Sequence, residues 1–362
     1  MRGLIWDGTD LVEVDDLDVV PPGPGQVTVE VRAAGLCHSD IKPIDGEMAQ
    51  PVPAVLGHEA VGVVRARGAG VELPLGRRVV LSVLQTCGTC AACTAGRPTL
   101  CTGPKDGTGA AADDPSPFRR DGQVVERFRR LGAFAEQTVV REWQAIPVSD
   151  EIPDTAAALL GCAVVTAFGA VEERARLGKG ESVLVIGAGG LGLNVVQAAR
   201  LAGAGQITVI DRNPRKAEIA GLMGATDFAI ATSDDDVVER SRVLRQSGYD
   251  AVFECVGAPG LVGAAVRSMA WGGRTVMVGV PPYGRDFVLP SHGLFYDQAL
   301  LGCRMGGVDP HATIPALVER HARGELQLEA LVTKVRPLAE ANQMIDDLRR
   351  GELDRGVFNV GA

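Results

Sequence analysis

A glycine-rich turn between an apolar strand and a helix limits the fold more than any other feature of the chain. The stretch reads "SVLVIGAGGLGLNVVQAARLAG", in which Gly187, Gly189 and Gly192 give the pattern G-x-G-x-x-G around Gly190 and Leu191. In such a motif the first glycine makes a tight turn, the second lets a pyrophosphate approach the backbone, and the third lets the helix pack on the strand. The context therefore predicts a dinucleotide whose phosphates face the helix N-terminus.

An acidic residue follows at the distance that such a site requires. The next apolar stretch, "QITVID", ends at Asp211, twenty-four residues after Gly187. A carboxylate there accepts hydrogen bonds from both ribose hydroxyls of NAD and repels a 2′-phosphate. Arg212 comes directly after it and could accept a 2′-phosphate, so NADP stays open, although Asp211 favours NAD. The alternative interpretation is a glycine turn followed by a helix-capping aspartate.

The pattern of apolar residues differs between the two halves of the chain and predicts two domains. From about residue 165, continuous apolar strands such as "YDAVFECVG" and "GGRTVMVGV" alternate with helical stretches, which is typical of a parallel doubly wound sheet. Before about residue 150, "QVTVEVRAAG" and "RRVVLSV" lie between glycine and proline turns, as in an antiparallel barrel. The tail from about residue 310 reads helix, strand, helix, strand, and we expect it to complete the first domain. Residues 102–131 are polar and rich in helix and strand breakers, which predicts a long surface excursion.

Composition excludes several classes of function. The 362 residues are 46% hydrophobic but contain no apolar run of eighteen, so we expect no membrane span. The start, "MRGLIWDGTDLVEVDD", lacks the basic and apolar regions of a signal peptide, which predicts a cytoplasmic protein. A net charge of −9 disfavours a nucleic-acid partner.

Four of the eight cysteines lie within fifteen residues. Cys87, Cys90, Cys93 and Cys101 are spaced C-x2-C-x2-C-x7-C. Thiols stay reduced in the cytoplasm, where clustered cysteines bind metal more often than they pair. Four thiolates fill a tetrahedral zinc shell, which predicts a structural zinc; an iron–sulfur cluster and reactive thiols are the alternatives.

A second group of ligand types is scattered along the chain. "GLCHSD" contains Cys37, "LGHEAVG" contains His58 and Glu59, and "LLGCAVV" contains Cys162. Two thiolates and one imidazole leave zinc one open position, as in a catalytic site. Spacing alone does not bring these residues together, and a buried cysteine is more often a small apolar side chain than a ligand.

With these motifs in view, the whole chain resembles the zinc-dependent alcohol dehydrogenases of the medium-chain dehydrogenase/reductase superfamily. The resemblance rests on "GLCHSD", "GHEAVGVV", the four-cysteine lobe, "GAGGLG", "VID", "FECVG", "VMVGVPP" and "GELDRGVFNV". It implies an α/β protein with a GroES-like β-barrel catalytic domain at 1–164 and 309–362, carrying a zinc lobe at about 86–102. A Rossmann domain with a doubly wound parallel sheet is implied for 165–308.

The resemblance also implies roles for residues near the metal. Cys37, His58 and Cys162 correspond to ligands of a catalytic zinc, and Glu59 to the acid beside it that can transiently coordinate it. Asp40 corresponds to an acid that orients His58, and Ser39 to the hydroxyl that takes the proton of the alcohol. Two positions depart from the common pattern, because Lys42 replaces a relay histidine and Val83 replaces an aromatic residue of the pocket.

Further residues correspond to cofactor contacts. The implied set is His38 and Arg355 on the pyrophosphate, Lys216 on the adenosine ribose beside Asp211 and Arg212, and Val278, Val280, Cys303 and Met305 around the nicotinamide.

The chemistry implied is hydride transfer from an alcohol to NAD, or the reverse, with two zinc ions per chain and a small-molecule alcohol or aldehyde as substrate. We expect a homodimer. Three alternatives stay open: a thiol-adduct formaldehyde dehydrogenase, a nicotinoprotein that never releases NAD, and a catalytically inactive structural relative. The physiological alcohol does not follow from the sequence.

Overall fold

The structure is a computed structural model that describes residues 1–102, 114–289 and 292–361. The chain divides into two compact units, Met1–Cys162 together with Asp309–Ala362, and Ala163–Val308. In the described part no single helix is long and apolar enough to cross a membrane, although Asp154–Gly161 and Ala163–Ala175 meet that test as a bent pair.

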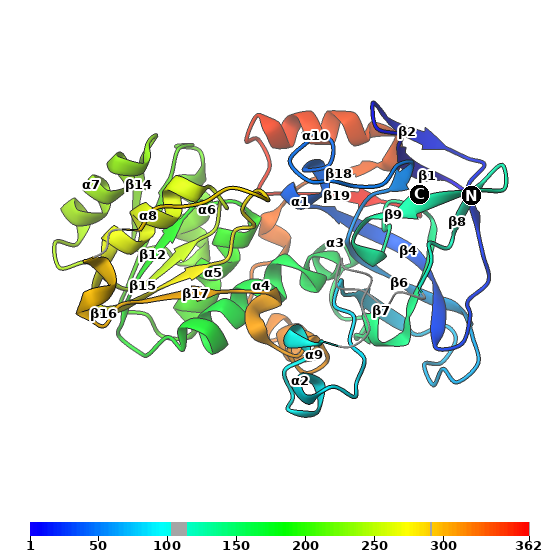
Figure 1. The fold of residues 1–362 in the computed structure, drawn as a ribbon, viewed down its shortest axis with the longest axis horizontal. Coiled ribbons are helices and arrows are strands. Elements are labelled where there is room, and N and C mark those ends of the chain that lie inside the picture. The colour runs from blue at the N-terminus through cyan, green and yellow to red at the C-terminus, as the bar shows by residue number, and fades with distance from the viewer. Residues whose placement is uncertain (103–113, 290–291, 362) are drawn as a thin grey trace. The chain divides into compact units, whose positions relative to one another are not determined.

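The second unit is built on one sheet of six parallel strands, with helices on both faces (Figure 1). Its strands, in spatial order, are β14 (Asp227–Ile230), β13 (Gln206–Asp211), β12 (Ser182–Ile186), β15 (Tyr249–Glu254), β16 (Met269–Met277) and β17 (Ala299–Gly302). This order is that of a Rossmann sheet, in which ligands bind at the carboxyl ends of the strands. The predicted doubly wound parallel sheet is therefore confirmed.

Two helices, α7 (Asp234–Leu244) and α9 (Pro310–Ala322), begin after a residue whose side chain caps them. In α7, Ser233 accepts a hydrogen bond from the Asp236 N–H, and three aspartates occupy the first turn, where negative charge is favoured. The helices are α1 (His38–Ile41), α2 (Ala91–Thr94), α3 (Asp154–Ala157), α4 (Ala163–Gly169), α5 (Gly190–Leu201), α6 (Lys216–Met223), α7 (Asp234–Leu244), α8 (Pro259–Ser268), α9 (Pro310–Ala322) and α10 (Ala341–Arg349). Short helical turns lie at Pro98–Leu100, Phe128–Arg130, Glu142–Gln144, Ala158–Gly161, Ala170–Ala175, Gly293–Tyr296, Met305–Gly307, Glu329–Leu331 and Leu338–Glu340.

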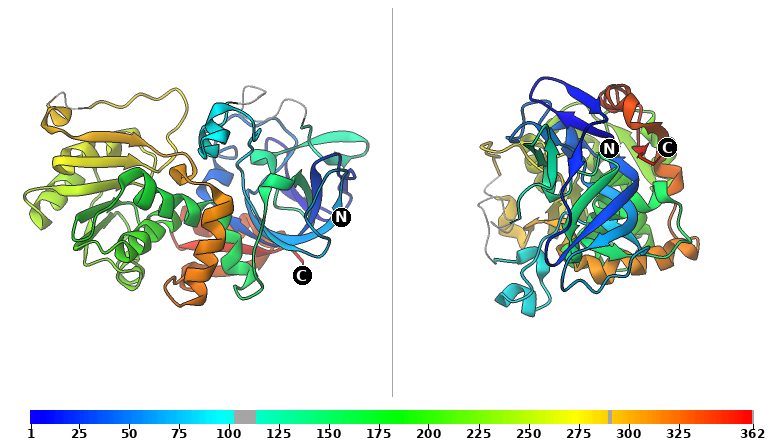
Figure 2. Two further views of the ribbon diagram at one scale, coloured as in Figure 1. Left: turned by 90° about the horizontal axis from the view of Figure 1, so that it is seen from below. Right: turned by 90° about the vertical axis from the view of Figure 1, so that its right-hand side faces the viewer.

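The first unit contains two sheets that curve around a common core (Figure 2). One has the strand order β2 (Leu11–Val14), β1 (Gly3–Trp6), β5 (Ala54–Val55), β9 (Gln123–Arg127), β8 (Phe118–Arg120) and β3 (Asp18–Val19). The other runs β11 (Ala145–Pro147), β7 (Arg78–Leu81), β6 (Glu59–Arg67), β4 (Gln26–Leu36), β19 (Arg355–Asn359) and β18 (Val332–Pro337), with β10 (Gln137–Arg141) also paired to β4. The tail thus returns to this unit, because β19 pairs antiparallel with β4.

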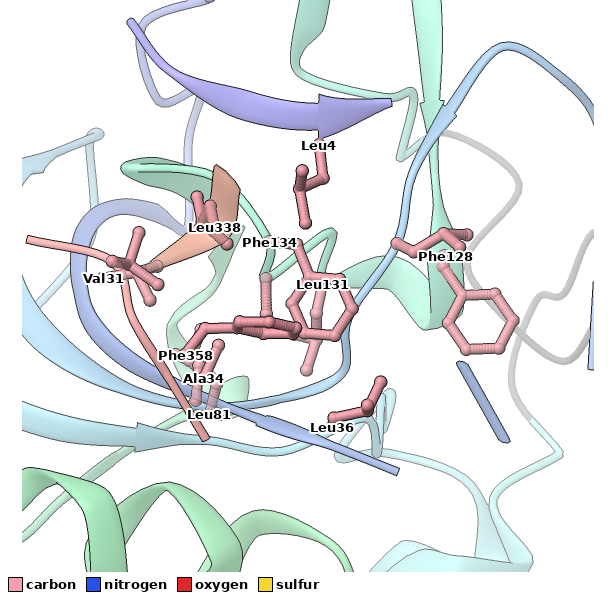
Figure 3. Close-up of a cluster of buried hydrophobic side chains, with 14 of the residues drawn as sticks. Leu4, Val31, Ala34, Leu36, Leu81, Phe128, Leu131, Phe134, Leu338 and Phe358 are labelled. Carbon is pink, nitrogen blue, oxygen red and sulfur yellow. The ribbon is translucent and has the colours of Figure 1, made fainter. Parts of the chain in front are cut away.

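The core of the first unit gathers side chains from distant parts of the chain (Figure 3). Phe134 and Phe358 are both buried and meet edge to face, with ring centroids 5.0 Å apart. Leu4, Leu36 and Leu131 belong to the same cluster. Packing of this kind fixes the β strands that carry the metal-ligating residues described below.

The predicted surface excursion at 102–131 is wrong for its second half. Residues 103–113 lie outside the described residues, but β8 and β9 follow, and Phe118 and Leu131 are fully buried. The charge of Arg127 does not keep this segment at the surface, because the buried Asp114 carboxylate pairs with it at 2.7 Å. The sequence stretch looked polar because its apolar residues are few and are spaced by arginines.

Candidate functional site

The four clustered cysteines converge on one point. Their sulfurs lie close together, at 3.6 Å for Cys90–Cys93, 3.6 Å for Cys87–Cys101 and 3.9 Å for Cys90–Cys101. A disulfide requires about 2.05 Å, so these sulfurs are not bonded to one another. Tetrahedral zinc with Zn–S bonds of about 2.3 Å gives sulfur–sulfur edges of about 3.8 Å, which the lobe matches.

Backbone hydrogen bonds in the zinc lobe lower the pKa of two of its four thiols. Backbone N–H groups of Cys93 and Thr102 lower the pKa of Cys90 to about 5, and those of Thr89 and Cys90 lower the pKa of Cys87 to about 7. Burial and the neighbouring sulfurs raise the pKa of Cys93 to about 12. Thiolates are the form that binds metal, so these backbone N–H groups favour the metal-binding form of Cys90 and Cys87.

A second cluster forms in the same unit from residues far apart in sequence. One ligand atom each from Cys37, His58, Glu59 and Cys162 lies within 4.8 Å of the others. Cys37 follows β4, His58 and Glu59 stand at the start of β6, and Cys162 follows the helical turn Ala158–Gly161. The fold thus brings together the ligands that spacing could not, and their chemistry fits a zinc ion with an open position.

The Asp40 carboxylate forms hydrogen bonds with two of these ligand residues. Its Oδ1 lies 2.6 Å from His58 Nδ1, and its Oδ2 accepts a hydrogen bond from the Cys37 backbone N–H at 2.9 Å. A carboxylate on one ring nitrogen fixes the tautomer and turns the other nitrogen toward the metal. The orientation of His58 and the start of α1 are therefore held by one buried side chain.

Glu59 has a partner that the sequence analysis did not foresee. The Arg355 guanidinium forms a buried ion pair with Glu59 Oε2. Sheet register explains the contact, because β4 lies between β6 and β19, with Gly35 opposite Glu59 and Leu36 opposite Gly356. Glu59 Oε1 is buried without a hydrogen-bond partner in the described structure, which leaves it for a metal ion.

The pKa values of the three ligand side chains in this cluster are shifted in different directions. Burial lowers the pKa of His58, but the charge and hydrogen bond of Asp40, followed by Cys37, raise it to about 9. The hydrogen bond from Cys162 holds the pKa of Cys37 well below its usual range, while the same bond and burial raise the pKa of Cys162. The ionised form is thus favoured more for Cys37 than for Cys162, and a metal ion would bind the deprotonated form of each ligand.

The residues of helix α1 lie at the edge of this cluster. Ser39 is half-buried and His38 is exposed. Lys42, which stands where the family resemblance implies a relay histidine, is buried and pairs with Glu47 at 3.2 Å. Val83 is partly buried and packs against the core of the first unit.

In the second unit, the glycine motif has the geometry that its sequence predicts. Gly187 has φ +95°, which favours glycine, and a Cβ on Gly192 would stand 1.9 Å from the Gly187 carbonyl oxygen. A Cβ on Gly189 would meet nothing within 4 Å, so the protein leaves space above this backbone. Gly190 begins α5 and Leu191 is half-buried on it. The motif fits a dinucleotide pyrophosphate.

Asp211 links the second strand to this turn. Its Oδ2 accepts a hydrogen bond from the Ala188 N–H at 2.6 Å, and its Oδ1 accepts one from the Asn213 N–H at 2.8 Å. The carboxylate is only half-buried, so its remaining acceptor positions are accessible to a ribose. Arg212 is exposed, and Lys216 is buried at the first turn of α6.

The remaining predicted cofactor residues follow the carboxyl ends of the last strands. Val278 is buried after β16, and its N–H donates to the Glu254 carbonyl at 2.9 Å; Val280 beyond it is exposed. Cys303 follows β17, where burial raises its pKa to about 11. Met305 has φ +49°. His38 and Arg355 belong to the first unit.

Two further residues near the metal-ligating cluster were not predicted. The Phe128 ring meets His58 edge to face, with centroids 5.7 Å apart, and the Arg129 guanidinium covers Phe128 at 5.3 Å. No sequence signal marks these positions, because they stand in a stretch that we interpreted as surface loop.

The comparisons agree with this geometry. Residues 23–150 match the model of an alcohol dehydrogenase GroES-like domain, and residues 190–323 match that of a zinc-binding dehydrogenase. An S-(hydroxymethyl)glutathione dehydrogenase of Synechocystis is 35% identical over 96% of each chain.

Solved structures resemble the fold over nearly its full length. An alcohol dehydrogenase zinc-binding domain protein from Burkholderia ambifaria has a TM-score of 0.91 at 30% identity, covering 100% of this chain and 99% of its own. Benzyl alcohol dehydrogenase from Acinetobacter calcoaceticus has a TM-score of 0.89 at 28% identity, covering 99% of each. The chain therefore belongs to the zinc-type alcohol dehydrogenases of the medium-chain dehydrogenase/reductase superfamily.

Proposed function

We propose that the protein is an NAD-dependent zinc alcohol dehydrogenase that interconverts an alcohol and its aldehyde or ketone. The observation that carries the proposal is the convergence of Cys37, His58 and Cys162 in one unit of a chain whose other unit carries the glycine motif. Three protein ligands of this type leave one coordination position for a substrate oxygen. When bound, zinc supplies a Lewis acid that lowers the pKa of an alcohol, and the nicotinamide supplies the hydride acceptor.

The residues around the cluster orient the substrate and accept the proton of its hydroxyl group. Asp40 holds His58 in the tautomer that leaves Nε2 for the metal. Ser39 accepts the proton of the substrate hydroxyl at its Oγ and passes it toward solvent. Lys42 is engaged with Glu47, which supports a relay that does not run through residue 42. Glu59 approaches the metal through its unpartnered Oε1, while Arg355 neutralises its other oxygen.

The cofactor is NAD in this proposal, and two zinc ions are bound per chain. Support for NAD comes from Asp211, whose charge opposes a 2′-phosphate. The pyrophosphate is assigned to the glycine motif, and the family resemblance implies His38 and Arg355, of the catalytic domain at 1–164 and 309–362, as further pyrophosphate-binding residues. The adenosine ribose meets Asp211, Arg212 and Lys216. The nicotinamide meets Val278, Val280, Cys303 and Met305 from the Rossmann domain at 165–308.

We place the enzyme in the cytoplasm as a homodimer. Two thiolate metal sites with no disulfide among the described cysteines suit a reducing compartment. Support for the dimer comes from β17, which pairs with β16 on one side and is the last strand of its sheet. An apolar edge strand of this kind calls for cover, which a second copy supplies.

The test is an activity screen with purified, zinc-loaded protein and NAD over aliphatic, aromatic and acidic alcohols, followed at the NADH absorbance band. Metal analysis should give two zinc ions per chain. Cys162→Ala should lose turnover, whereas an equivalent change at Cys255, which is outside both clusters, should retain it. Turnover that survives Cys162→Ala would contradict the proposal.

A second candidate has one observation in its favour, the 35% identity to a relative named S-(hydroxymethyl)glutathione dehydrogenase. In this case the alcohol is the adduct of formaldehyde with a thiol. The two candidates share the metal and cofactor chemistry and differ in the substrate alone. Comparison of kcat/KM for the glutathione adduct with that for a simple primary alcohol decides between them.

A further inference from the structure

Two neighbours of different kinds hold the His58 imidazole, which is almost fully buried. The Asp40 carboxylate lies 2.6 Å from Nδ1, and the Phe128 ring meets the imidazole edge to face, with centroids 5.7 Å apart and planes at 73°. A hydrogen bond at one ring atom fixes the tautomer and the place of that atom, but the ring can still pivot about it. Contact with a second ring opposes this pivoting, because aromatic rings prefer an edge-to-face arrangement.

Phe128 is itself firmly placed in the first unit. Its side chain is almost fully buried and belongs to the core cluster of Figure 3. Its carbonyl accepts hydrogen bonds from the N–H groups of Leu131 at 3.0 Å and Gly132 at 3.1 Å, which close the turn after β9. The residue before it, Arg127, is anchored by the buried ion pair with Asp114. The ring therefore cannot move away from the imidazole without breaking contacts on both sides of the turn.

Strand pairing explains why this ring lies beside a metal-ligating residue. β5 pairs parallel with β9, and Val55 stands opposite Arg127. Beyond this pair the two segments continue in the same direction, one to His58 and the other to Phe128. The contact thus joins residues that are far apart in the sequence, and it is built into the register of the sheet.

We propose that Phe128 is a positioning residue of the metal site. Its ring keeps the His58 imidazole in one orientation, so that Nε2 is presented to a metal ion that Cys37 and Cys162 also hold. The inference rests on the proposed function, because it concerns the zinc ion of that site, and it adds a residue that acts only through His58. Partners that orient a ligating histidine contribute to metal affinity, and the loss of one weakens binding by about tenfold or more.

The first measurement is zinc affinity, by competition with a chromophoric chelator on the full chain. Phe128→Leu keeps an apolar side chain but removes the ring, and it should weaken by about tenfold the binding of the zinc ion that Cys162→Ala loses. Phe128→Tyr keeps the ring and should bind zinc as wild type does. The matched control is Phe358→Leu, the same substitution in the same core cluster, because the Phe358 ring meets Phe134 and not a metal ligand. It should lower the free energy of unfolding without changing zinc affinity.

The second measurement is the visible spectrum of the cobalt-substituted protein, which reports ligand geometry and does not depend on turnover. The bands of the cobalt ion that Cys162→Ala loses should shift or broaden in Phe128→Leu and stay unchanged in Phe128→Tyr and Phe358→Leu. If Phe128→Leu is not recovered folded, Phe128→Met, whose flexible side chain fills irregular space, takes its place in both measurements.

The outcomes separate the inference from the proposed function. If wild type binds two zinc ions and Phe128→Leu matches it in affinity and cobalt spectrum, the inference is wrong and the proposed function stands. Equal weakening of zinc binding in Phe128→Leu and Phe358→Leu would also reject the inference, since the effect would then come from the core in general. If wild type binds no metal ion that Cys162→Ala loses, the proposed function fails, and the positioning role of Phe128 fails with it.

Discussion

At the scale of single residues, Asp211 holds the glycine turn and is also the residue that we propose to bind the cofactor ribose. Its two carboxylate oxygens already accept backbone hydrogen bonds from Ala188 and Asn213, so it shapes the glycine turn before any cofactor binds. Substitution therefore has two consequences that must be separated, the loss of the turn and the loss of the charge. An amide keeps an acceptor but no charge, and glycine removes both.

Asp211→Asn should weaken NADH binding and improve NADPH binding, because the charge that repels a 2′-phosphate is gone while Arg212 remains. A charge-assisted hydrogen bond contributes roughly 1.5–3 kcal/mol, so NADH affinity should fall at least about tenfold. Fluorescence titration of both cofactors measures the change, with Asp211→Gly as the more severe variant. An NADH affinity equal to that of wild type would remove Asp211 from the ribose site.

The raised pKa of Glu254 predicts that the free energy of unfolding depends on pH. Burial raises its pKa, although the N–H groups of Gly257 and Val256 act in the opposite direction. The folded protein therefore binds this proton more tightly than the unfolded chain. The stabilisation is complete below the unfolded pKa, about 4.3, and is lost as pH rises through the folded pKa.

Glu254→Gln cannot ionise and can still accept the two backbone hydrogen bonds. Its free energy of unfolding relative to wild type should increase with pH, as urea denaturation of both proteins at several pH values will measure. Glu181 is the contrasting control, because burial is outweighed by the Arg274 hydrogen bond and its pKa is lowered. Glu181→Gln should lose stability relative to wild type as pH rises from the folded pKa to the unfolded pKa, and the difference should stay constant above that. Parallel behaviour of the two variants would contradict the assignment.

At the scale of elements, β9 depends on a buried ion pair. Asp114 accepts hydrogen bonds from Arg127 at 2.7 Å, Gln26 at 2.7 Å and Gln85 at 2.9 Å, and Gln85 precedes the zinc lobe by one residue. The carboxylate thus joins β4, β9 and the start of the lobe. This network explains how an arginine-rich segment becomes part of the interior.

Asp114→Asn should destabilise the first unit by roughly 3–5 kcal/mol, because it leaves the Arg127 charge buried without its counterion. The exposed pair of Asp16 with Arg120 offers the matched control, since Asp16→Asn should cost only about 0–1 kcal/mol. Urea unfolding followed by circular dichroism gives both values. Equal effects of the two substitutions would show that the buried network is not what holds β9.

The two metal clusters belong to elements of different kinds, and their cysteines should respond differently. Cys93 lies in a lobe with short helical turns and little apolar core, so Cys93→Ala should destabilise or unfold it, because structural zinc contributes folding free energy. Cys162 is held between buried neighbours, so Cys162→Ala should abolish turnover with a small loss of stability. Limited proteolysis, metal analysis and assays on both variants test the contrast. Loss of turnover without proteolytic sensitivity in Cys93→Ala would contradict it.

At the scale of the whole molecule, the edge strand β17 of the Rossmann sheet predicts that two chains form a dimer. Light scattering should give the mass of two chains, and Leu301→Lys in β17 should shift the protein toward monomer, since a charge opposes pairing at an apolar edge. Val335→Lys on β18 is the control, because it places the same charge at an exposed position of another strand. A monomeric wild type would reject the dimer.

The features of this protein that depend on residues close together in the sequence could be predicted from the sequence alone. The four cysteines of the lobe lie within fifteen residues, and Gly187 to Gly192 form one turn, so their function needs only short-range geometry. The strand and helix pattern likewise indicated the parallel sheet, because apolar periodicity is a local property. The tail was also recognised as a return to the first domain, from its pattern and from the family resemblance.

Tertiary structure alone decided the contacts between distant residues. Cys162, which follows the helical turn Ala158–Gly161, joins Cys37 and His58. Arg355 meets Glu59 because β4 pairs with β6 on one side and β19 on the other. Asp114 and Arg129 were hidden in a stretch that looked like surface loop, since composition does not reveal which arginine finds a counterion. These partners depend on strand register and backbone reversal, which follow from packing of the whole domain rather than from any short segment of the chain.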